Sequence, residues 1–278
     1  MNNYLDKIMT TKPECIAVAK RKCSLADVKA MCLDAQPTKP FAQSIRNRNG
    51  IIAEFKRQSP SKGIIHTDIT PSAVVPYYEE AGVSAVSVLT DEMFFGGTIA
   101  DLREASAAVN IPILRKEFII DPYQIYEARA NGASAVLLIA AVLSVGQAQD
   151  LAGLAAEIGL EVLMELHGTD EIGYMVDGVT VAGINNRDLR TFNVDLQHSI
   201  SVAHMLPANL PKISESGIKS VDDMIMLRQK GFDGFLIGEN FMKEENPGKA
   251  CIEFCKRYNS LEIRVLRLCR FRRLRYVV

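Results

Sequence analysis

Acidic and basic side chains stand together where an apolar run of this sequence ends. The run Ile51–Phe55 contains Glu54, and Lys56 follows two positions later. Alternate side chains of a β-strand face the same side, so a strand here would direct both groups into one space and turn Phe55 away from it. A carboxylate and an ammonium in one water-poor site can accept and release protons during a reaction. A structural salt bridge is the alternative interpretation of this pair.

Polar side chains also end three later apolar runs, namely Lys116, Glu165, and the neighbours Asn185 and Arg187. A buried charge is costly unless an opposite charge or a hydrogen bond compensates it. Lys116 and Glu165 would meet this condition if they surrounded one opening together with the first pair, and their pKa values would then be shifted. We therefore interpret these side chains as parts of one catalytic site.

The elements that must position these residues are eight short apolar runs, which alternate with amphipathic stretches from residue 51 onward. Eight such units predict an α/β fold, a (β/α)8 TIM barrel, because parallel strands buried on both faces read as continuous apolar runs. A doubly wound open sheet is the alternative, although the turn at 57–63 lacks the glycine pattern typical of that fold. The eight runs are Ile51–Phe55, Ala85–Leu89, Ile111–Leu114, Ala135–Ile139, Glu161–Leu166, Val181–Ile184, Lys212–Ser214 and Gly234–Ile237.

The last two runs are followed by residues suited to a phosphate. Ser216 and Gly217 follow the seventh run, and Gly238 and Glu239 follow the eighth. The loops after strands seven and eight of a TIM barrel form its usual phosphate site, where backbone N–H groups receive the dianion. Because a glycine at a strand end is often only a turn, each of these residues alone is a weak signal.

Composition excludes several classes of protein. The chain has 278 residues, with 32 Lys and Arg against 33 Asp and Glu, so its net charge of −1 argues against a general nucleic-acid-binding surface. No apolar stretch approaches the roughly 20 residues of a membrane span, and the N-terminus lacks a signal-peptide pattern. We therefore expect a cytoplasmic protein that binds no membrane.

Histidine and cysteine spacings give no metal signal. The four histidines show no HxxxH or HxH pattern, and the six cysteines form no CxxC pair. We expect no metal site and reduced, structural cysteines. His167 follows the fifth run closely, and we interpret it as an exposed loop histidine.

The chain divides into a barrel and two terminal segments. We predict one domain over residues 1–258, in which 49–258 form the barrel and 1–48 form a helical extension. Residues 259–278 form a basic tail, with six arginines and no acidic residue from position 264 onward. We expect this tail to be a disordered, non-catalytic appendage outside the fold.

Several segments resemble those of the indole-3-glycerol phosphate synthase family, in the same order as the predicted strands. The family closes an indole ring on a carboxyphenylamino-deoxyribulose phosphate, with loss of carbon dioxide and water. The resemblance covers about residues 1–258, and the basic tail resembles nothing in the family. The matching segments are 51–61, 89–91 with 95–97, 112–118, 164–165, 183–189, 214–218 and 235–239.

The resemblance implies residue roles that periodicity alone does not give. It implies Lys116 as general acid and Glu165 as general base, assisted by Glu54 and Asn185, with Lys56 on the anthranilate carboxylate. It places the substrate against Ser59, Phe95, Arg187, Glu215, Ser216, Gly217, Gly238 and Glu239, with Phe95 on the aromatic ring. Glu239 stands where similar enzymes often have a small hydroxyl residue, so we expect its side chain to turn away from the phosphate.

The resemblance also implies that the enzyme needs no cofactor and that the N-terminal extension covers the catalytic mouth. We expect a monomer whose partner is a small phosphosugar, with no nucleic acid. Two other functions remain open from the residues. They are another phosphosugar barrel, such as phosphoribosylanthranilate isomerase, and a phosphosugar-binding regulator that uses its basic tail on nucleic acid.

Overall fold

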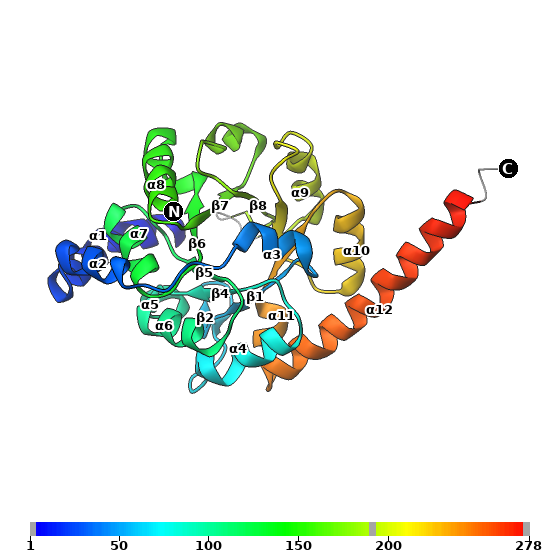
Figure 1. Ribbon diagram of the computed structural model, residues 1–278, viewed down its shortest axis with the longest axis horizontal. Helices are drawn as coiled ribbons and strands as arrows, with labels where there is room; N and C mark the ends of the chain where they lie inside the picture. The colour runs from blue at the N-terminus through cyan, green and yellow to red at the C-terminus, as the bar shows by residue number, and fades with distance from the viewer. Residues whose placement is uncertain (1–3, 189–192, 275–278) are drawn as a thin grey trace.

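The eight predicted runs form the strands of one closed barrel in the computed structural model (Figure 1). The structure describes residues 4–188 and 193–274, with side chains described up to residue 261. All neighbouring barrel strands are parallel, and β1 closes the ring by pairing with both β4 and β10. The predicted (β/α)8 TIM barrel is therefore confirmed. The barrel strands are β1 (Ile51–Phe55), β4 (Ala85–Leu89), β5 (Ile113–Lys116), β6 (Ala135–Ile139), β7 (Glu161–Leu166), β8 (Val181–Asn185), β9 (Lys212–Glu215) and β10 (Gly234–Ile237).

Helices form an outer ring around the strands (Figure 1). Several begin at capping boxes, in which a side chain at the helix start and one three residues later bond each other's backbone N–H groups. Thr98 with Asp101 starts α6, and Ser220 with Asp223 starts α10. The ring comprises α4 (Pro71–Glu80), α5 (Glu92–Phe95), α6 (Ile99–Ala108), α7 (Pro122–Ala130), η1 (Ala140–Val142), α8 (Val145–Glu157), η2 (Thr169–Tyr174), α9 (Leu196–Ala203), α10 (Val221–Gln229), α11 (Glu239–Met242) and α12 (Pro247–Leu274). A hairpin of β2 (Gln58–Ser59) and β3 (Gly63–Ile64) follows β1.

The third strand lies two residues later than its predicted run. Pro112 has no backbone N–H, and the strand begins after it. It then continues through Arg115, whose guanidinium bonds Glu127 at 2.7 Å and the Gln124 carbonyl at 2.8 Å. Because these partners compensate its charge, a buried strand can carry this arginine.

Two apolar clusters hold the barrel. One lies between the strands and the outer helices, and it contains Ile51 and Phe55. The other fills the barrel interior, and it contains Ile52 and Leu163. Phe55 therefore faces the helices while its neighbour Glu54 faces inward, as the alternation in β1 predicts.

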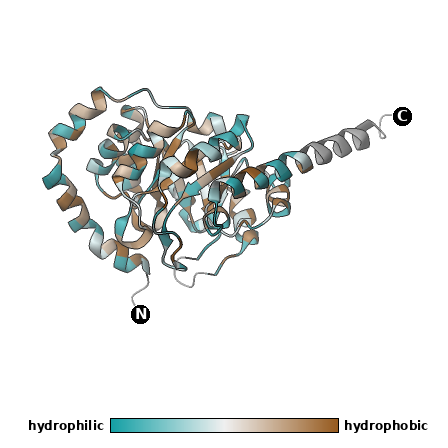
Figure 2. Ribbon diagram, turned by 90° about the horizontal axis from the view of Figure 1, so that it is seen from below, coloured by the Kyte–Doolittle hydropathy of each residue, from teal (hydrophilic) through white to brown (hydrophobic). Residues whose placement is uncertain are grey.

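The N-terminal extension reaches both ends of the barrel. It consists of α1 (Tyr4–Lys22), α2 (Leu25–Leu33) and α3 (Phe41–Asn47), and Figure 2 shows it passing along the outside of the barrel. Helix α1 lies at the carboxyl ends of the strands, where Tyr4 and Ile8 line the cavity described below. Helix α3 closes the opposite end, where Phe41 and Ile45 join the interior cluster. The expectation that all of residues 1–48 cover the mouth is therefore wrong for α3, because its two apolar side chains plug the bottom of the barrel.

The C-terminal helix α12 begins against the barrel and projects away from it (Figures 1 and 2). Its backbone stays helical to Leu274, in contrast to the disorder that we expected for the tail. Residues 259–274 contain no glycine or proline, and their leucines and arginines are good helix formers. The basic side chains from position 264 onward lie outside the described residues, so their role stays a prediction.

Candidate active site

A cavity opens at the carboxyl ends of the barrel strands, and all eight strands contribute to its wall. This end carries the chemistry in TIM barrels. The cavity brings together every site residue that the sequence analysis named, although their roles stay predictions. These residues are Glu54, Lys56, Ser59, Phe95, Lys116, Glu165, Asn185, Arg187, Glu215, Ser216, Gly217, Gly238 and Glu239.

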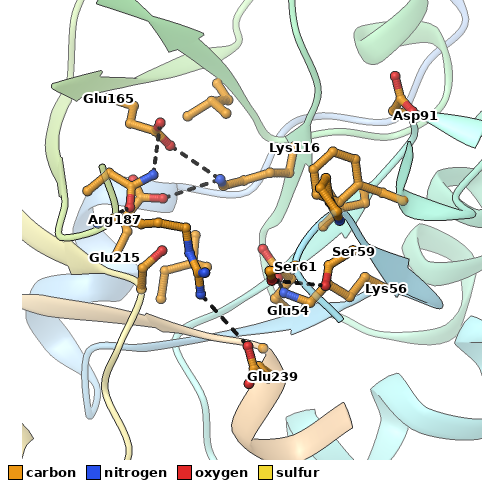
Figure 3. Close-up of a pocket in the computed structure, with 18 of the residues that line it drawn as sticks. Glu54, Lys56, Ser59, Ser61, Asp91, Lys116, Glu165, Arg187, Glu215 and Glu239 are labelled. Atoms are coloured by element: carbon orange, nitrogen blue, oxygen red, sulfur yellow. Dashed lines mark hydrogen bonds and ion pairs between the residues drawn. The ribbon is translucent and has the colours of Figure 1, made fainter. Parts of the chain in front are cut away.

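Lys116 lies between two buried carboxylates at the centre of the site (Figure 3). Its Nζ atom is 3.3 Å from Glu165 Oε2 and 3.3 Å from Glu215 Oε2. Burial alone would lower the pKa of Lys116, but the negative charges of Glu165, Glu215 and Glu54 raise it above its usual value. The ammonium therefore holds its proton and is directed at two carboxylates.

The two carboxylates differ in protonation. Burial raises the pKa of Glu215 to about 8, since the nearby charge of Glu165 adds to the effect and only Lys116 opposes it. Burial also opposes ionisation of Glu165, but Lys116, His167 and Asn185 outweigh it and hold the pKa of Glu165 well below its usual value. The two carboxylates therefore shift in opposite directions, which favours the charged form at Glu165 and the protonated form at Glu215.

Asn185 orients the charged carboxylate. Its Nδ2 atom donates to Glu165 Oε1 at 3.1 Å, and its Oδ1 atom accepts from the Arg187 backbone N–H at 3.0 Å. Both bonds together fix the amide, so Oε1 of Glu165 is held while Oε2 faces Lys116.

Glu54 and Lys56 form an ion pair of 2.6 Å at the cavity wall. Gly238 lies directly against Glu54, because a Cβ atom at position 238 would stand 2.4 Å from Glu54 Oε1. A glycine is therefore needed there to leave space for Glu54, in addition to the close backbone approach that the sequence analysis expected.

The backbone after β9 has an unusual shape. Ser216 has a φ of 66°, and it is the one non-glycine residue with positive φ in the described part of the chain. Gly217 follows with a φ of 76°. A left-handed serine is a strained conformation that often marks a functional site.

Glu239 does not turn away from the cavity. Its carboxylate lies 3.4 Å from Lys62 Nζ and 3.8 Å from Arg187 Nη2, the contact drawn in Figure 3. Two cations at the same rim attract this side chain, and its orientation relative to the phosphate stays a prediction.

An apolar wall faces the charged groups. Phe95 and Phe118 lie with ring centroids 6.3 Å apart, and Tyr4, Leu5 and Ile8 from α1 complete the wall. Such a surface suits a planar aromatic group.

The sequence analysis missed a buried charge network that joins α1 to the barrel. Lys12 Nζ lies 2.6 Å from Asp91 Oδ2 and 2.7 Å from Glu117 Oε1, and all three side chains are 5% exposed. Thr90 donates to the second carboxylate at 2.9 Å. No local pattern links positions so far apart in the chain, although the two acidic residues follow strand ends as the other site residues do.

His167 is not the exposed loop histidine that we expected. Its side chain is 16% exposed, and its Nε2 atom lies 3.2 Å from Glu165 Oε1. The only sequence signal for this contact is its position two residues after Glu165.

Among the described residues, no group of three or more His, Cys, Asp or Glu side chains is arranged to hold a metal ion. Likewise, no helix in the described part of the chain is long and apolar enough to cross a membrane. Whether the reaction needs a cofactor stays a prediction.

Comparison with known proteins assigns the family. A family model described as indole-3-glycerol phosphate synthase matches residues 5–254. A relative of that name from Bacteroides thetaiotaomicron is 44% identical over 257 residues, which cover 92% of this chain and 99% of the relative. The chain belongs to the indole-3-glycerol phosphate synthase family. A second synthase, from Neisseria gonorrhoeae, is 43% identical over 256 residues and covers 89% of this chain and 97% of its own length.

Membership confirms the function and enzyme class that the sequence resemblance implied, a carboxy-lyase of tryptophan biosynthesis. Solved structures agree on the fold alone. A mutant tryptophan synthase alpha-subunit from Pyrococcus furiosus has a TM-score of 0.58 at 11% identity, covering 77% of this chain and 98% of its own. Thiamine phosphate pyrophosphorylase from the same organism has a TM-score of 0.54 at 14% identity, covering 76% and 95%.

Proposed function

We propose that this cavity converts 1-(2-carboxyphenylamino)-1-deoxy-D-ribulose 5-phosphate to indole-3-glycerol phosphate, with Lys116 as general acid and Glu165 as general base. The observation that carries this assignment is the position of the Lys116 ammonium, 3.3 Å from the Glu165 carboxylate and 3.3 Å from the Glu215 carboxyl group. One buried site thus holds a proton donor and a proton acceptor of opposite charge.

Each chemical step has a group to serve it. In ring closure the aromatic carbon that bears the carboxylate attacks the ketose carbon, and Lys116 gives a proton to the ketose oxygen. Carbon dioxide then leaves, and its bonding electrons restore the aromatic ring. In the last step Lys116, recharged with a proton from solvent, protonates the leaving hydroxyl group, which departs as water. Glu165 takes the proton from the neighbouring carbon, which completes the indole double bond. Glu54 and Asn185 assist, the latter by orienting Glu165.

The remaining lining residues bind the substrate. Lys56 pairs with the anthranilate carboxylate, and Phe95 packs on the aromatic ring. Ser216 and Gly217 donate to the phosphate, and the left-handed backbone at both residues supports this role. Ser59, Gly238, Glu239, Glu215 and Arg187 complete the binding wall.

The test is to follow indole absorbance when purified protein is mixed with the carboxyphenylamino substrate. Lys116→Ala should lower kcat by about 10²–10⁴-fold while the phosphate and carboxylate contacts still bind substrate. Lys116→Arg should not restore turnover, because guanidinium keeps its proton near neutral pH.

Glu165→Gln should also lower kcat, since an amide accepts no proton at the pH of the reaction. Circular dichroism checks that each variant is folded. Near-normal turnover by Lys116→Arg would overturn the proton-donor assignment and leave Lys116 as an electrostatic clamp.

A further inference from the structure

His167 contacts the proposed general base from outside the substrate cavity. It follows the end of β7, and it is not among the described residues that line the cavity. Its Nε2 atom is 3.2 Å from Glu165 Oε1, the same oxygen that accepts from Asn185 at 3.1 Å. Oε1 therefore accepts a hydrogen bond from Asn185 and lies beside the His167 ring, with which it forms a charge contact and no hydrogen bond, while Oε2 faces Lys116.

The imidazole is itself held from its other side. Its Nδ1 atom lies 3.7 Å from Glu171 Oε2, in the 3-10 helix η2, and the same carboxylate accepts the His167 backbone N–H at 2.5 Å. The ring of His198, on α9, contacts the His167 backbone carbonyl. Carboxylate, imidazole and carboxylate thus form a chain from the site to the half-buried Glu171.

The charges around this chain favour an imidazolium. Burial lowers the pKa of His167, but Glu165 and Glu171 outweigh it and raise the pKa to about 10. The other titratable groups that face the chain are Lys116 and Glu215 across Glu165, and His198 against the His167 carbonyl. Both ring nitrogens are shielded from solvent, so the positive charge acts on Glu165 with little screening.

We propose that His167 is a positioning residue that holds Oε1 of Glu165, so that Oε2 is the oxygen presented to the substrate, and that Glu171 holds His167 in turn. This inference rests on the proposed role of Glu165 as general base. The carboxylate keeps the Asn185 hydrogen bond and the neighbouring imidazolium charge at Oε1 when the Lys116 ammonium turns from Oε2 to the substrate.

The experiment compares His167→Asn with the wild type, and His204→Asn is the matched control because His204 is exposed at the end of α9. His167→Asn should lower kcat by about 10- to 100-fold, because it removes the positive charge that lies against Glu165 Oε1. KM should stay within about threefold of the wild-type value, because the phosphate contacts lie on other strands. The control should match the wild type.

The pH profile separates positioning from packing. Loss of a neighbouring positive charge raises the pKa of a carboxylate, so the acidic limb of kcat/KM should move to higher pH by about one unit in His167→Asn. Glu171→Gln should lower kcat in the same direction by a smaller factor, and it supplies the test if His167→Asn does not fold. A fall in kcat without movement of the acidic limb would mean that His167 only supports the loop, and would overturn the proposal.

A double variant keeps this proposal distinct from the proposed function. If His167 acts through Glu165, adding His167→Asn to Glu165→Gln should cause no further loss in kcat. Independent multiplication of the two losses would overturn the positioning role. Near-normal turnover by Glu165→Gln alone would overturn the base assignment itself, whereas an inactive Glu165→Gln beside a fully active His167→Asn would overturn this inference only.

Discussion

Position 238, directly after β10, has no room for a methyl group. A substitution there therefore tests how closely this position packs against Glu54 of β1. A Cβ atom on Gly238 would lie 2.4 Å from Glu54 Oε1, 2.9 Å from Glu54 Cβ and 3.0 Å from Glu54 Cδ. The Glu54 backbone cannot retreat easily, since β1 is buried and paired on both sides. Gly238→Ala should therefore displace the Glu54 carboxylate from Lys56, its partner at 2.6 Å.

The expected cost follows from overpacking. Extra carbon atoms in a packed region cost about 1–3 kcal/mol, and each kcal/mol lowers the Tm of a protein of this size by about 2–4 °C. Gly238→Ala should therefore unfold about 2–12 °C below the wild type. The φ of Gly238 is −125°, so a left-handed backbone is not what requires glycine here, and the expected cost comes from the lack of space.

Thermal unfolding by circular dichroism gives the measurement, and Gly153→Ala is the matched control. Gly153 lies in α8, where a methyl group would meet no atom within 4 Å, so alanine should stabilise by about 0.5–1 kcal/mol there. In a Glu54→Ala background the penalty of Gly238→Ala should shrink, because two of the three close contacts are gone. A Gly238→Ala protein that melts at the wild-type temperature would refute the reasoning.

Three further predictions concern the charges and the phosphate loop. Lys12→Met should destabilise the fold by about 3–5 kcal/mol, because it leaves two buried carboxylates without their cation. The control Lys20→Met breaks an exposed ion pair and should cost at most about 1 kcal/mol. Equal losses of the two variants in thermal unfolding would contradict this. Ser216→Ala should raise KM by about 10- to 100-fold with little change in kcat, because the proposed function places its hydroxyl on the phosphate and away from the reacting bonds. A large fall in kcat at constant KM would place the phosphate elsewhere. The imidazolium of His167 should stabilise the fold fully below pH 6.5 and lose this effect as pH rises to about 10. The free energy of unfolding measured in urea should therefore fall more steeply at alkaline pH in the wild type than in His167→Asn. Parallel curves would argue against the raised pKa.

The strands were predictable because of how they are buried. Five of the eight runs match the observed bounds, since a parallel strand covered on both faces has apolar residues throughout. The prediction failed by two residues at β5, where Arg115 carries a charge into the buried layer. The carboxylate and the carbonyl that compensate this guanidinium come next to it only in the folded protein. The apolar pattern alone therefore could not predict that the strand continues through Arg115.

The candidate site was predictable where a residue follows a strand end, and not where a contact depends on another segment. Lys116 and Glu165 end strands, and the barrel closure brings them together. Lys12 belongs to a helix whose place at the mouth is set by long-range packing, so its two partners could not be read from its neighbours. His167 was misread for a similar reason, because Glu171 reaches it only after η2 has folded back.

The site balances its cations with its own carboxylates, and this arrangement bears on how an anionic substrate binds. Glu54 neutralises Lys56, Glu165 and Glu215 share Lys116, and Glu239 lies between Lys62 and Arg187. A substrate that carries a carboxylate and a phosphate would replace these internal partners one by one. The carboxylates therefore hold each cation in place before binding, which limits the reorganisation that catalysis requires. Lys56 has Glu54 as its carboxylate partner, so removal of Glu54 should affect stability and binding together, whereas Lys116 keeps one partner when Glu165 or Glu215 is removed.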